Sequence, residues 1–130
     1  MDTNQLGAIT EGKVMSVLLS AGYTVAVPFG VAKYDLILER PKGSFQRIQC
    51  KTGRLRDGTV RFNAYSLKGT RTQKYGKLLY QGEADFFGVY CPDLDKVYLV
   101  PVQGQRSEVS LRVDPAKTNV QVNWAKDYEI

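Results

Sequence analysis

The sequence predicts an α/β fold, with a mixed central sheet of four or five strands flanked by helices. Two observations carry this prediction: apolar residues recur at helical spacing over 5–21, and short β-rich runs bounded by turn residues follow. The chain has 130 residues, 43% of them hydrophobic, which suits one domain over 1–130 with a buried core. No apolar run approaches the roughly 20 residues that span a bilayer. We therefore expect a soluble, cytoplasmic protein with no membrane partner and no signal peptide.

The N-terminal helix is the first predicted element. Polar residues at 2–4 are available as N-caps, and Gly22 ends the helix. Glu11 lies seven positions before Leu18, so its carboxylate is expected at the edge of the apolar stripe. A carboxylate held there needs a partner, a metal or a catalytic role, whereas a surface position at the stripe boundary is the alternative. A short β-rich run at 23–27 follows the helix.

A β-hairpin is predicted next. Residues 34–39 (YDLILE) and 45–51 (FQRIQCK) form its strands, joined by a Pro-Lys-Gly-Ser turn. Alternation along the second strand places Gln49 and Lys51 on one face, and Cys50 on the other.

Further strands are predicted in the second half of the chain. Residues 61–64 form a short strand, and 67–80 are basic with weak helical character. The apolar, β-branched runs 86–91 and 96–102 form a second hairpin that belongs to the core. Residues 109–113 form one more strand.

The residue types that are missing exclude several kinds of chemistry. The sequence contains no histidine, which rules out Ser-His-Asp and Cys-His nucleophile systems, histidine bases and His-ligated zinc. The two cysteines, Cys50 and Cys91, have no CxxC spacing and are predicted to be reduced core residues. Catalysis must therefore use carboxylates, lysines, amides or a hard metal ion.

Positive charge is concentrated in one part of the chain. The net charge is +5 and the pI about 9.2. Residues 42–77 hold ten basic residues and one acid, a net charge of +9, while the remainder carries −4. This local charge predicts a DNA-binding surface that contacts phosphates, and a solvated cationic face is the alternative. The proposed DNA-binding residues are Arg54, Arg56, Arg61, Lys68, Arg71, Lys74 and Lys77.

Three predicted elements bring chemically active groups together. The helix carries Glu11, the first strand of the hairpin carries Asp35, and the second carries Gln49, Cys50 and Lys51. The carboxylates and the backbone carbonyl of Cys50 are oxygen ligands that Mg²⁺ accepts. Lys51 would orient or deprotonate an attacking water, or neutralise charge on the phosphate; an ordinary strand-end lysine is the alternative.

This spacing resembles the PD-(D/E)XK nuclease superfamily, which has an acid on its second strand and (D/E)XK on its third. Asp35, thirteen residues and then Gln49-Cys50-Lys51 match the signature, and Glu11 matches the acid that many members carry on the first helix. Gln49 replaces the usual second acid and can still ligate a metal through its amide oxygen, with one ligand charge fewer. The resemblance implies a restriction-endonuclease-like core and Mg²⁺-dependent hydrolysis of DNA, with Mn²⁺ as a substitute.

Two smaller groups within the superfamily are also similar to this chain. The segments QCKTGRLRDGTVRF, ADFFGVYCPDLDKVYLVPV and NWAKDYEI resemble intron-encoded homing endonucleases with the same QXK variant. The size and the order of elements resemble archaeal-type Holliday junction resolvases.

Three functions follow as hypotheses. One active site per chain implies that at least a homodimer, or a higher homo-oligomer, cuts the two strands. A small dimer offers surface for phosphates and shape rather than for a long sequence, which predicts structure-selective cleavage of junctions. Site-specific cleavage of the homing type is the first alternative. The second is a catalytically inactive DNA-binding module.

Overall fold

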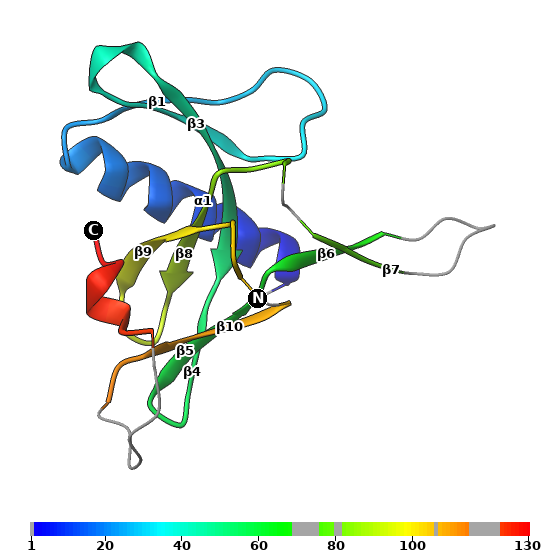
Figure 1. The fold of residues 1–130 in the computed structure, drawn as a ribbon, viewed down its shortest axis with the longest axis vertical. Helices are drawn as coiled ribbons and strands as arrows, with labels where there is room; N and C mark the ends of the chain where they lie inside the picture. The colour runs from blue at the N-terminus through cyan, green and yellow to red at the C-terminus, as the bar shows by residue number, and fades with distance from the viewer. Residues whose placement is uncertain (1, 69–75, 80–81, 106, 115–122) are drawn as a thin grey trace.

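The main sheet has five strands in the order β1-β2-β3-β8-β9 (Figure 1). β3 and β8 are parallel and the other neighbouring pairs antiparallel, so the sheet is mixed, as predicted. The strands are β1 (Thr24–Ala26), β2 (Leu36–Glu39), β3 (Phe45–Thr52), β8 (Phe86–Cys91) and β9 (Lys96–Pro101). This computed structural model describes residues 2–68, 76–79, 82–105, 107–114 and 123–130.

Helix α1 (Thr3–Ser20) covers one face of this sheet (Figure 1). Its N-terminus is capped by the side chain of Asp2, which accepts the main-chain N–H of Gln5 at 2.7 Å. Val14 and Leu18 are fully buried in a cluster that includes Ile48 of β3. α1 crosses β8 at Gly88, where a Cβ atom would lie 2.7 Å from Cγ1 of Val14. The glycine therefore allows helix and sheet to approach closely.

A second, three-stranded sheet packs on the opposite face, in the order β10-β5-β4. Its strands are β4 (Arg54–Arg56), β5 (Thr59–Asn63) and β10 (Glu108–Arg112). Phe62 of β5 packs edge-to-face on Phe87 of β8, with ring centroids 5.4 Å apart, so Phe62 is a core residue. Asp57 and Gly58 connect β4 and β5 with φ of 49° and 71°. Two consecutive positive φ values are the geometry of a type I′ hairpin turn.

The helical character predicted for 67–80 is wrong where the structure describes this segment. Residues Tyr65–Lys68 form β6 and Gly76–Leu79 form β7, an antiparallel pair that extends away from both sheets (Figure 1). The segment 67–80 contains two glycines, which disfavour helix. The parallel pair β3 and β8 is therefore joined by a connection that contains β4 to β7.

The two cysteines and the C-terminal segment complete the described structure. Cys50 and Cys91 are free and buried, which confirms their placement in the core.

The short 3₁₀ helix η2 (Ala125–Asp127) follows Trp124, which forms a bridge to Arg112 of β10. A second 3₁₀ turn, η1 (Pro41–Gly43), links β2 to β3. The described helices include none with the length and apolarity that a membrane crossing requires.

Candidate active site

Asp35 is fixed at the start of β2 by two contacts with β3. Its main-chain N–H donates to the carbonyl of Ile48 at 2.8 Å. Oδ2 of its carboxylate accepts the main-chain N–H of Cys50, also at 2.8 Å. The strand begins two residues later than predicted, at Leu36, which pairs with Ile48. The hairpin therefore places Asp35 beside Gln49, Cys50 and Lys51.

Glu11 on α1 lies close to Asp35. Burial raises the pKa of the Glu11 carboxyl above its usual value, and the charge of Asp35 and a side-chain hydrogen bond with Asp35 raise it further. The structure therefore brings together the two carboxyl groups that the sequence singled out. Two carboxylates held side by side repel each other unless a proton or a cation lies between them.

Lys51 extends from β3 toward the base of β6. Its Nζ donates to the main-chain carbonyl of Tyr65 at 2.9 Å. Burial lowers the pKa of Lys51 below its usual value, and the charge of Asp35 partly opposes that shift. The lysine is therefore held within electrostatic range of Asp35, with its proton less firmly bound than in water.

Gln49 and Cys50 provide the remaining groups of the predicted site. Nε2 of Gln49 lies 3.5 Å from the carbonyl oxygen of Cys50. Rotating the amide by 180° would exchange its nitrogen for its oxygen with little change in shape. The Cys50 side chain points to the α1 face, where it joins the cluster of Ile48. Burial, and then the charges of Asp35 and Glu11, raise the pKa of its thiol, so it is not a nucleophile.

The donors of this site suit a hard divalent cation. Asp35 contributes to the shifted pKa values of Glu11, Cys50 and Lys51, so its carboxylate lies close to all three residues. Within the described residues, no group of three His, Cys, Asp or Glu side chains gathers around one point. The donors here are two carboxylates, one amide and one carbonyl. Mg²⁺ commonly uses one or two carboxylates and completes its shell with water and substrate phosphate, so these residues fit it.

A buried pair of hydroxyl groups, not found from the sequence, connects the two halves of the site. Oγ1 of Thr10 and Oγ1 of Thr52 are 2.6 Å apart, and Thr10 is 2% exposed. Thr10 precedes Glu11, and Thr52 follows Lys51. The pair therefore links α1 to β3 next to the residues of the site. The four-residue spacing of Thr10, Val14 and Leu18 is the sequence signal that could have identified Thr10 as buried.

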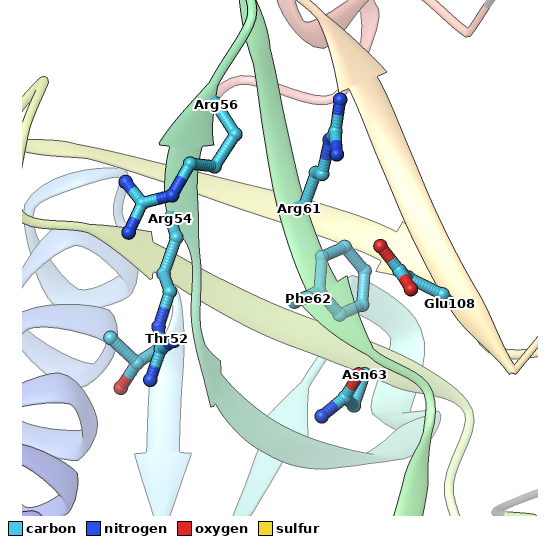
Figure 2. A pocket seen from close by; sticks show the side chains of 7 residues that line it. All are labelled: Thr52, Arg54, Arg56, Arg61, Phe62, Asn63 and Glu108. Atoms are coloured by element: carbon cyan, nitrogen blue, oxygen red, sulfur yellow. The ribbon is translucent and has the colours of Figure 1, made fainter.

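The predicted DNA-binding residues are partly described. The arginines at 54, 56 and 61 line a hollow of about 430 Å³ on the second sheet (Figure 2). Thr52, Phe62, Asn63 and Glu108 complete its lining, with Glu108 on the side opposite Arg54 and Arg56. Lys68 lies in β6 and Lys77 in β7. Arg71 and Lys74 lie outside the described residues.

Comparison with known proteins agrees with this geometry. The solved structure of a bacterial homing endonuclease, I-Ssp6803I, matches the fold with a TM-score of 0.77. The match covers 99% of this chain and 89% of that one, at 20% sequence identity. No curated protein matches the sequence. The model of the PD-(D/E)XK endonuclease family matches residues 1–130, and the chain therefore belongs to this family.

Proposed function

We propose that this protein is a metal-dependent DNA endonuclease whose active site consists of Glu11, Asp35, Gln49 and Lys51. The observation that carries the proposal is the position of the Asp35 carboxylate. It is fixed on the N–H of Cys50 at 2.8 Å, with a second carboxyl beside it and a lysine within electrostatic range. Family membership supports the reaction class, because these enzymes are endonucleases.

The residues have distinct roles in this proposal. Glu11, Asp35, the amide oxygen of Gln49 and the carbonyl of Cys50 hold Mg²⁺, or Mn²⁺ as a substitute. Magnesium bound there supplies Lewis-acid activation of the phosphate and of water. Lys51 places a positive charge next to the phosphate, where negative charge develops during hydrolysis. Its lowered pKa also makes proton exchange with the attacking water easier.

The substrate proposed is duplex DNA, cut at a preferred sequence by a homodimer. Each chain provides one set of site residues, so cleavage of both strands requires two copies. The similarity in fold to a homing endonuclease supports a duplex substrate. A four-way DNA junction is the second candidate, because a net charge of +9 over residues 42–77 suits the recognition of phosphates and shape.

One experiment tests reaction class and substrate together. The protein is incubated with a randomised duplex library, and with four-way junctions of unrelated sequence, in Mg²⁺ or in EDTA. The proposal expects Mg²⁺-dependent cleavage of a subset of duplexes, with no preference for junctions. Paired nicks about the crossover would establish the junction substrate instead. DNA binding without cleavage in Mg²⁺ or Mn²⁺ would show that the chain is a binding module.

A further inference from the structure

The second sheet has two chemically different faces. Leu55, Val60 and Leu111 point toward the main sheet and pack in its core. On the other face, the register places Arg54 opposite Arg61, and Asn63 opposite Glu108. We call Arg54, Arg61, Asn63 and Glu108 the outer-face residues. Alternation along antiparallel strands thus concentrates polar side chains on one solvated surface.

Arg54 and Arg61 bring two positive charges onto neighbouring strands of the same face, although their side chains point in opposite directions (Figure 2). Like charges directly opposite on neighbouring strands destabilise a sheet. Arg61 donates to Oγ1 of Thr59 at 2.9 Å and reaches a carboxylate oxygen of Asp57 at 3.5 Å. The Asp57 side chain is 89% exposed, so water screens this ion pair. The two arginines therefore add little to stability, and their positive charge is available to a ligand.

We propose that the outer-face residues read base edges in the major groove of duplex DNA. This inference rests on the proposed function and adds how the protein selects the DNA sequence that it cuts. Neighbouring strands lie about 4.8 Å apart, so the β4–β5 hairpin fits a groove about 12 Å wide.

The chemistry of the four side chains favours bases over phosphates. Arginine pairs with guanine, asparagine with adenine, and glutamate accepts from the amino group of cytosine. A surface that bound phosphates alone would gain nothing from Glu108, because its carboxylate repels them.

The position of this surface indicates which bases it reads. Thr52 lines the hollow and directly follows Lys51 of the active site. Arg54 is three residues beyond Lys51, a distance of roughly 10 Å along an extended chain. With about 3.4 Å between successive nucleotides of a strand, this corresponds to about three base-pair steps. The contacted bases thus lie a few base pairs from the cleaved phosphate.

The test is selection of bound duplexes from a randomised library by the full-length protein in EDTA, where no cleavage is needed. Wild type should select a consensus. Arg54→Gln and Arg61→Gln should each lose about 5- to 150-fold of the discrimination between bases at one or two positions of the consensus. The discrimination at the other positions should be unchanged. Lys42→Gln is the matched control, since Lys42 is an exposed basic residue of the same window in the η1 turn. It should leave the consensus unchanged.

Two results would overturn the inference. One is the absence of any consensus with wild type. The other is a uniform loss of affinity in the arginine variants with the consensus intact, which would mean that the arginines contact phosphates. A consensus without cleavage in Mg²⁺ would refute the proposed enzyme and leave this inference standing, whereas cleavage without a consensus would do the reverse.

Discussion

Asp35 and Asp85 occupy equivalent positions on either side of β3. Each directly precedes a neighbouring strand, and each donates its own N–H to a carbonyl of β3, at 2.8 Å to Ile48 and at 2.9 Å to Arg47. Each carboxylate also accepts a main-chain N–H of β3: Asp35 from Cys50 at 2.8 Å, and Asp85 from Arg47 at 2.7 Å. The backbone therefore fixes both aspartates in the same way.

The two aspartates differ in their next neighbour. Asp85 forms an ion pair with the Arg47 side chain at 3.3 Å, and this contact lowers the pKa of Asp85 below its usual value. Beside Asp35 lies another acid, Glu11, whose pKa is raised. Asp85 is thus neutralised by an ion pair with Arg47, whereas Asp35 lies beside a second carboxyl group, with Lys51 within electrostatic range. In the proposed site, the second carboxylate beside Asp35 is what suits this fixed carboxylate to a metal ion.

Replacing each aspartate by its amide tests this comparison most directly. Asp35→Asn keeps an oxygen that can accept the Cys50 N–H but removes the charge, so cleavage should fall by at least about 10²-fold. Asp85→Asn is the matched control and should stay within a few-fold of wild type. Both rates are measured on one duplex substrate, with DNA binding followed in parallel. Equal losses in the two variants would mean that the aspartates are both structural.

Glu11→Gln should weaken the response to magnesium. Losing one of two carboxylates should move the midpoint of a Mg²⁺ titration of cleavage upward by at least the roughly 10-fold that loss of an outer-shell partner costs a metal site. An unchanged titration curve would remove Glu11 from the site.

The same variant should change how stability depends on pH. Because the folded pKa of Glu11 lies above its usual 4.5, its stabilising contribution is complete below pH 4.5 and is lost as pH rises through the folded pKa. Without metal, Glu11→Gln should therefore gain stability relative to wild type as pH rises through this window. Urea unfolding at several pH values measures the difference.

Loss of the Thr10 hydroxyl and loss of the Thr52 hydroxyl should lower the free energy of unfolding by different amounts. Thr52→Val leaves the buried Thr10 hydroxyl without this partner and should lower the free energy of unfolding by about 1–3 kcal/mol. Thr10→Val should cost less, since Thr52 is only half-buried and water reaches its hydroxyl. The double variant should approach wild type, because both polar groups are removed together. Equal and additive losses would show that the hydroxyls do not interact.

Asp85→Asn should have the smallest effect, with a pH dependence opposite to that of Glu11→Gln. The folded pKa of Asp85 lies below its usual 3.8, so its contribution is present above pH 3.8 and is lost as pH falls through the folded pKa. The half-exposed ion pair should be worth less than about 1 kcal/mol at neutral pH. Unfolding curves of the two proteins should differ at pH 7 and converge in acid. A difference that persisted in acid would indicate a packing effect.

The sequence predicted the parts of the site that depend on local structure. Alternation in FQRIQCK correctly placed Cys50 with the buried residues, and the hairpin put Asp35 next to it. The sequence could not show that Asp35 and Asp85 differ, because each stands immediately before an apolar run. Only the fold shows that Glu11 lies beside Asp35 and that Arg47 pairs with Asp85.

Features that depend on pairing between distant parts of the chain were harder to predict from the sequence. β4 has only three residues, too few for a periodic pattern, although Asp57-Gly58 after it is a strong hairpin signal. The outer face of the second sheet joins β5 to β10, which is more than forty residues away in the chain. Such pairing depends on register, so the sequence identified Arg54 and Arg61 as basic residues without showing that they lie opposite each other.

The parallel pairing of β3 with β8 has a consequence for folding kinetics. α1 and the β1–β2–β3 meander use contacts close in sequence, whereas Ile48 must find Phe86 across an intervening connection that includes the strands β4 to β7. Folding rates fall as such non-local contacts accumulate, so β3 should acquire its second neighbour late. Until then one edge of β3 leaves its N–H and C=O groups available to other chains. Refolding at low protein concentration should therefore give a higher yield of native enzyme than refolding at high concentration.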